Sequence, residues 1–137
     1  MSAFNPNDLY DLLNRNRPLW LLNIDLSKAQ LAGAFFQGAF LQTANFQVSF
    51  LLGANFSQAV LRGANLQGAI LSSANLSATN LTGANLSDSF SDGVNFTNAN
   101  LTSADLHGAG LNGANLNNAN LVNANLHGAD LTNANLQ

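Results

Sequence analysis

Residues 61–86 read LRGANLQGAILSSANLSATNLTGANL, and every fifth residue of this stretch, from Leu61 to Leu86, is leucine. The same spacing continues outward in both directions. From Leu26 to Leu136, 22 of 23 such positions hold leucine or phenylalanine, and Ser91 is the exception. A strict period of five fits neither the α-helix, with about 3.6 residues per turn, nor a plain strand, whose side chains alternate. The period therefore predicts a coil with short straight sides.

The residues around each fifth position predict how one repeat folds. A small residue, usually alanine, stands two places earlier, and side chains two apart on an extended segment share a face. We therefore expect both to point into the core and the residue between them to point outward. Two places after the Leu/Phe position lie ten of the eleven glycines, which indicates a turn with positive φ. A turn in every repeat makes the chain coil and stack on itself.

The repeat resembles the A(D/N)LXX motif of the pentapeptide repeat family, as in Ala64-Asn65-Leu66-Gln67-Gly68 and Ala114-Asn115-Leu116. The resemblance covers residues 24–137. It implies an all-β solenoid, a right-handed quadrilateral β-helix with four pentapeptides per coil and about six coils. Residues twenty apart then become vertical neighbours, separated by about 4.8 Å, the spacing of paired strands.

The N-terminal segment does not follow the repeat. Asn5 suits a helix N-cap, Pro6 suits the first turn, and Pro18 would end the helix. We expect residues 1–18 to form a short amphipathic α-helix that caps the first coil, as in cyanobacterial members of the family. Residues 19–137 would form the β-helix, and the two parts together one structural domain.

Composition excludes several functions. Only 8% of the residues are charged, and the net charge of −3 argues against direct nucleic-acid binding. The chain has no cysteine, and no apolar stretch approaches the roughly 20 residues of a membrane helix. Residues 1–10 lack the basic start and apolar stretch of a secretory signal, so we expect a cytoplasmic protein with no membrane partner.

The outward positions hold mostly asparagine, but large apolar residues occupy several of them at spacings of twenty. Such stripes could be intramolecular, as cross-strand pairs or as the seat of the N-terminal helix, or they could bind a partner. One short helix cannot cover two opposite sides. We therefore take the stripe farther from the N-terminus as the candidate partner surface, and the other as a second apolar stripe or cap contact. The partner stripe is Phe50, Ile70 and Phe90; the second is Trp20, Phe40 and Val60, with Phe35 on the side between.

Titratable residues offer little chemistry. His107 and His127 stand twenty apart and should stack, but a metal site would need further ligands of the usual kind. Asp88 and Asp92 fall at turn positions without a nucleophile nearby. The glycines recur every five residues and do not form a phosphate-binding loop. We predict no catalytic, metal-binding or cofactor-binding residue, and no enzymatic activity, because a rod filled with leucine has no pocket.

Ser91 should interrupt the leucine ladder with space and an unpaired hydroxyl. Val94, in an alanine position, would fill part of the space. The alternative is a bulge that turns Phe90 inward; we expect the regular register.

These observations favour a rigid, non-catalytic module for protein–protein interaction or regulation. The alternative is a DNA-mimicking inhibitor of a type II topoisomerase such as gyrase, which the resemblance implies for some family members. Five aspartates along the repeats imitate the phosphate density of DNA poorly, and a supercoiling assay would distinguish the two functions.

The last repeat, at Leu136-Gln137, carries no cap. Two copies could therefore pair as a homodimer through the C-terminal coil, or the polar ends could tolerate water.

Overall fold

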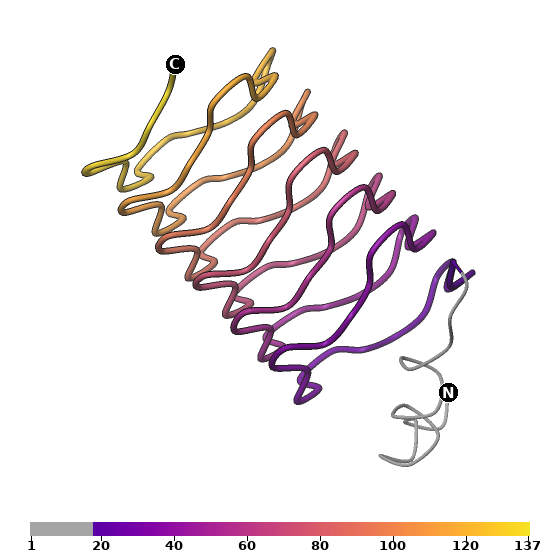
Figure 1. Ribbon diagram of the computed structural model, residues 1–137. Helices are drawn as coiled ribbons and strands as arrows, with labels where there is room; N and C mark the ends of the chain where they lie inside the picture. Colours follow the sequence, from indigo (N-terminus) through magenta and orange to yellow (C-terminus); the bar gives the residue numbers. More distant parts are fainter. Residues whose placement is uncertain (1–17) are drawn as a thin grey trace.

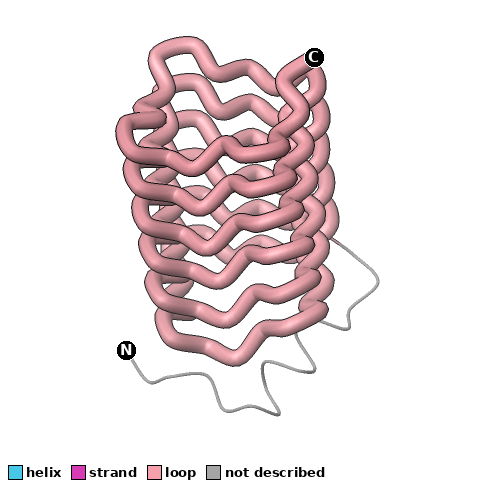
Figure 2. Tube along the Cα trace, turned by 90° about the vertical axis from the view of Figure 1, so that its left-hand side faces the viewer, coloured by secondary structure: helices cyan, strands magenta, loops and turns pink. Residues whose placement is uncertain are grey.

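The computed structural model describes residues 18–137, which form a four-sided rod of stacked coils (Figures 1 and 2). Parallel β pairing joins single residues twenty positions apart, from Trp20 with Phe40 to Asn115 with Asn135. Within these residues there is no helix and no strand longer than one such residue. The predicted repeat of four pentapeptides per coil is therefore confirmed, whereas the predicted capping helix lies outside the described residues apart from Pro18.

Backbone hydrogen bonds connect each repeat to the coils on both sides. Phe40 shows the pattern: its N–H donates to the carbonyl of Leu19 at 2.7 Å, and its carbonyl accepts from the N–H of Leu21 at 2.8 Å. The N–H of Asn23 donates to the carbonyl of Gln42, and the N–H of Ile24 closes the turn on the carbonyl of Leu21. The same bonds recur along the rod, so its coils are held at a fixed separation of about 4.8 Å.

The turn in every repeat places its third residue in the left-handed region. All ten glycines two places after a Leu/Phe position have positive φ, and so do thirteen other residues at equivalent positions. This is the geometry of a type II turn, and it confirms the turn predicted from the glycine spacing. Val48, with φ of 56°, is β-branched, a class of residue for which this conformation is strained.

Replacing Val48 with asparagine should stabilise the rod by about 1 kcal/mol, because asparagine tolerates the left-handed conformation and valine does not. Placing valine at the equivalent turn position one coil above, Gly68→Val, should destabilise the rod, since Gly68 has φ of +62°. Urea unfolding of both variants measures the two effects. A loss of stability in Val48→Asn would contradict this account.

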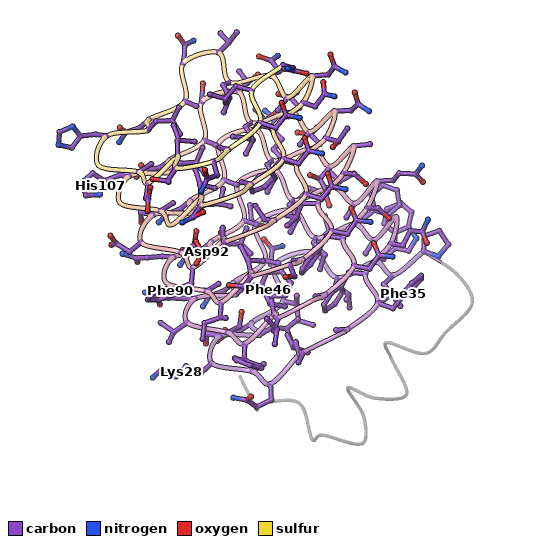
Figure 3. All side chains as sticks on the ribbon, turned by 60° about the vertical axis from the view of Figure 1, so that its left-hand side comes forward. Lys28, Phe35, Phe46, Phe90, Asp92 and His107 are labelled. Carbon is purple, nitrogen blue, oxygen red and sulfur yellow. The ribbon has the colours of Figure 1, made fainter. Side chains whose placement is uncertain are left out.

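The core consists of the two inward side chains of each repeat. Leucine, phenylalanine and alanine at these positions are almost fully buried from Phe36 to Leu116, as the period predicts. Three aromatic rings meet in the N-terminal half: Phe36 and Phe56 stack with centroids 4.8 Å apart, and Phe46 meets both edge-on. Figure 3 shows Phe46 inside the rod, with Phe35 and Phe90 on different sides of it.

At Ser91 the register stays regular, as expected. Its N–H donates to the carbonyl of Gly110 at 2.8 Å, and Phe90 pairs with Ile70 and Gly110 and points outward. The expected unpaired hydroxyl is wrong: the Oγ atoms of Ser91 and Ser89 lie 2.9 Å apart in a buried hydrogen bond. Ser89 occupies the position of the same repeat that usually holds alanine. The two serines that depart from the repeat therefore satisfy each other's hydroxyl groups. Val94 is also fully buried.

Toward the C-terminus the core becomes less buried. The inward leucines of the last coil, Leu121, Leu126 and Leu131, are only partly buried. No helix among residues 18–137 is long and apolar enough to cross a membrane.

Candidate partner-binding surface

Phe50, Ile70 and Phe90 lie one above another on one side of the rod. Parallel pairing joins Phe50 to Ile70 and Ile70 to Phe90, so the three side chains project from consecutive coils. Phe50 and Ile70 are half-buried, and Phe90 is 61% exposed. The stacking expected from the spacing of twenty is present; the binding role of the stripe stays a prediction.

Two further apolar residues widen this surface. Val48 and Leu52 occupy the turns on either side of Phe50, two residues away along the chain, and are 57% and 43% exposed. Their Cα atoms therefore lie within about 7 Å of that of Phe50. Sequence reasoning missed both because it examined only the outward position of each repeat. We call these five residues, Val48, Phe50, Leu52, Ile70 and Phe90, the apolar stripe.

Charged side chains lie at both ends of the apolar stripe. Asp88 and Asp92 are exposed in the turns on either side of Phe90, the same offset that Val48 and Leu52 have from Phe50. Lys28 lies one coil below Val48 at the other end of the stripe. Figure 3 shows Lys28, Phe90 and Asp92 along the same side of the rod. The stripe is therefore acidic near Phe90 and basic beyond Phe50.

In the coil above Phe90, Gly108 and Gly110 leave the backbone without side chains. Gly110 is the residue paired directly above Phe90, and a Cβ atom there would lie 3.4 Å from Oδ1 of Asp92. A Cβ atom at Gly108 would come within 2.5 Å of Oδ1 of Asp88. Both carboxylates thus reach toward the next coil on either side of Phe90. No large side chain stands directly above this ring.

Asparagine has a local role that the apolar residues give up. At most outward positions the asparagine Oδ1 accepts the N–H of the residue two places later, as Asn45 does from Gln47 at 3.1 Å. Asp25, Asp105 and Asp130 do the same. Among the described residues no such bond reaches the N–H of Leu52, Ser72 or Asp92, the residues two places after Phe50, Ile70 and Phe90. The stripe therefore forgoes a turn-capping bond in three consecutive coils.

The second apolar stripe also forms. The rings of Trp20 and Phe40 stack with centroids 4.0 Å apart and planes 14° from parallel, and Phe40 pairs with Val60. Trp20 is 70% exposed. Arg62 lies in the turn after Val60, so this stripe is flanked by positive charge. Contact with a capping helix falls on residues outside the described part and stays a prediction.

The remaining candidate groups do not assemble into a reactive site. The rings of His107 and His127 stack at 5.6 Å, as their spacing predicts. Within residues 18–137 no three His, Cys, Asp or Glu side chains come together in a way that could hold a metal ion.

The pKa of Asp130 lies below its ordinary value, mainly because the Thr132 hydroxyl donates a hydrogen bond to its carboxylate. The backbone N–H of Thr132 donates to the same carboxylate and lowers the pKa further. Asp130 pairs with Gly110 and adds a negative charge beyond Asp88 and Asp92.

A family model described as "Pentapeptide repeats (8 copies)" matches the chain in overlapping segments, which together cover residues 20–137. The matched segments are residues 20–47, 41–77, 49–88, 79–117 and 99–137. Comparison with curated proteins found no match.

Several solved structures are similar to this one. A pentapeptide repeat protein from the Arabidopsis thaliana thylakoid lumen is 30% identical, with a TM-score of 0.55 over 88% of this chain and 70% of that one. A pentapeptide repeat protein from Nostoc Pcc 7120 is 43% identical, with a TM-score of 0.54 over 55% of this chain; the match spans 62% of the Nostoc chain.

A trypsin-treated form of QnrB1, a plasmid-mediated fluoroquinolone resistance protein, has a TM-score of 0.56 over 85% of this chain and 72% of its own. At 19% identity it shows likeness of fold alone. The fold of this chain is the right-handed quadrilateral β-helix, as the family resemblance implies.

Proposed function

Because this chain belongs to the pentapeptide repeat family, we propose that it is a non-catalytic interaction or regulatory module that binds a protein partner through the apolar stripe. The proposed setting is the cytoplasm. The rod supplies the rigidity, since backbone hydrogen bonds fix each coil on the next. The stripe supplies the contact area, since exposed apolar patches on otherwise polar proteins usually mark interaction surfaces.

The observation that carries this proposal is the replacement of asparagine by apolar residues in three consecutive coils. An asparagine at positions 50, 70 and 90 would cap its turn, as Asn45 and Asn95 do elsewhere. The apolar residues forgo that bond and leave Phe90 largely in water. A local departure from the repeat that gives up a turn-capping bond and exposes an aromatic ring is expected at a functional surface.

No particular observation favours the DNA-mimic alternative. The described rod carries five aspartates together with Lys28 and Arg62, which is far below the one charge per roughly 1.7 Å of duplex DNA. Its likeness to the fluoroquinolone resistance protein is one of fold.

The proposal is tested by placing a photo-crosslinking amino acid at position 70, or at position 65 on a polar side, in the protein expressed in its native host. We expect one defined protein to be crosslinked from position 70 and not from position 65. That protein, purified, should bind Phe50→Asp/Ile70→Asp at least about tenfold more weakly than the wild type, because apolar contacts at the centre of an interface dominate affinity.

The matched control is Phe40→Asp/Val60→Asp, which introduces the same charges on the second apolar stripe. It should leave binding of the crosslinked protein unchanged. Circular dichroism of all variants verifies the fold, and Phe50→Asn/Ile70→Asn, with the residue common at these positions, replaces the aspartate variant should that one unfold. Equal binding by the wild type and the stripe variants would refute the proposal.

A further inference from the structure

The spacing of the apolar stripe discriminates between the secondary structures that a partner could present. Phe50, Ile70 and Phe90 recur every coil, about every 4.8 Å along the rod. Apolar residues of an α-helix at i, i+4 and i+7 recur about every 5.2 Å along its axis. The two spacings differ by less than about 1 Å over three coils. Same-face residues of a strand recur about every 6.7 Å, so a strand along the stripe falls out of register after one step.

The unequal distribution of charge along the apolar stripe would orient a partner bound to it. Asp88 and Asp92 stand on either side of Phe90 and reach toward the next coil, where Gly110 leaves the backbone free of a side chain. Asp130 adds a third carboxylate one coil farther on, while Lys28 lies at the opposite end. A cationic side chain near Phe90 would be attracted by the carboxylates on both sides of the ring and by the ring itself.

The second apolar stripe lacks this arrangement. Arg62 follows Val60, and the turn positions on both sides of the Trp20–Phe40–Val60 column carry no carboxylate among the described residues. A basic partner would therefore select the apolar stripe over the second one.

We propose that the occupant of the apolar stripe is an amphipathic α-helix of a partner protein, lying along the rod axis. Its apolar residues at i, i+4 and i+7 rest on Phe50, Ile70 and Phe90, and lysine or arginine at one end lies between Asp88 and Asp92. This inference rests on the proposed function and adds the conformation and charge of the partner.

Three synthetic peptides of equal length test it. The first is an 18-residue helix-forming peptide with leucine at i, i+4 and i+7 and lysines at one end. The second has glutamate in place of those lysines. The third has the composition of the first, with leucine at i, i+2 and i+4. We expect the wild-type protein to bind the first peptide, measured by fluorescence anisotropy at low salt, and to bind the other two at least about tenfold more weakly.

The protein variants separate local from general electrostatics. Asp88→Asn/Asp92→Asn should weaken binding of the first peptide about three- to tenfold and reduce its salt dependence. Asp25→Asn/Asp105→Asn removes the same charge from another side, where asparagine already occupies the neighbouring coils, and should leave binding unchanged. Equal weakening by both pairs, equal binding of the acidic peptide, or preference for the strand-patterned peptide would each overturn the inference.

Failure of this inference can be distinguished from failure of the proposed function. A natural partner that crosslinks at position 70 but binds Asp88→Asn/Asp92→Asn as tightly as the wild type would leave the interaction surface standing and refute the basic helix. The absence of any partner at position 70 would refute the proposed function itself.

Discussion

Replacing Phe46 with alanine should destabilise the rod by about 3–5 kcal/mol, the cost of truncating a fully buried phenylalanine. Phe46 is fully buried, and its ring meets Phe36 and Phe56 edge-on, with centroids 5.7 and 5.6 Å away. The substitution removes the buried ring and two aromatic contacts worth about 0.5–1.5 kcal/mol each beyond burial. The stacked pair of Phe36 and Phe56 would then border a cavity.

Chemical unfolding, followed by circular dichroism and by the fluorescence of Trp20, the single tryptophan, measures the loss. Phe46→Leu is the matched control, because leucine occupies the same position one coil above, at Leu66, and should lose only about 1–1.5 kcal/mol. Leu126→Ala, in the partly buried last coil, should also lose less than Phe46→Ala. Equal losses at Phe46 and Leu126 would contradict a core centred on the aromatic cluster.

Restoring leucine at position 91, where the series of buried leucines is interrupted, should have the next largest effect: the free energy of unfolding should rise by about 2 kcal/mol. The triple variant Ser89→Ala/Ser91→Leu/Val94→Ala gives this coil the inward side chains of the coils below and above it. Those coils carry Ala69, Leu71 and Ala74 below, and Ala109, Leu111 and Ala114 above. The variant therefore fits without crowding.

The gain has two sources. The variant buries about one more methylene than the wild type, worth about 0.8 kcal/mol. It also removes two hydroxyls whose mutual hydrogen bond replaces their hydration only in part.

Urea unfolding gives the stability, and amide hydrogen exchange between residues 86 and 96 should slow, because neighbouring coils share their interface energy. Ser89→Ala alone is the control and should destabilise the rod, since it leaves the buried Ser91 hydroxyl without its partner. A triple variant no more stable than the wild type would show that the serine pair is not a weak point.

The vertical neighbours could be predicted from the period of five together with the four repeats per coil that the family resemblance implies. The spacing of twenty that results gives the pairs Trp20–Phe40, Phe50–Ile70 and His107–His127, and the structure contains all three. The regular register at Ser91 was also predictable, since a bulge would have shifted every later repeat.

Side-chain contacts within one coil could not be predicted from the spacing of twenty, which relates only residues in neighbouring coils. The hydrogen bond between Ser89 and Ser91 depends on two rotamers within one side of the coil. The width of the apolar stripe depends on the exposure of Val48 and Leu52 in the turns, which the outward-position rule does not describe. The bond from asparagine Oδ1 to the N–H two residues later was a recoverable signal, because asparagine commonly caps turns in this way.

The repeat pattern is enough to predict the coil, its core and, with four repeats per coil, the order of side chains along each side, because identical repeats stack in register on one another. Which departures from that period come into contact depends on how the side chains pack in the folded rod. Phe46 reaches two stacked rings across the interior, and Asp88 and Asp92 flank Phe90 over a bare glycine backbone. The physical reason is that a period fixes the positions of Cα atoms, whereas contact and exposure depend on side-chain size and rotamer.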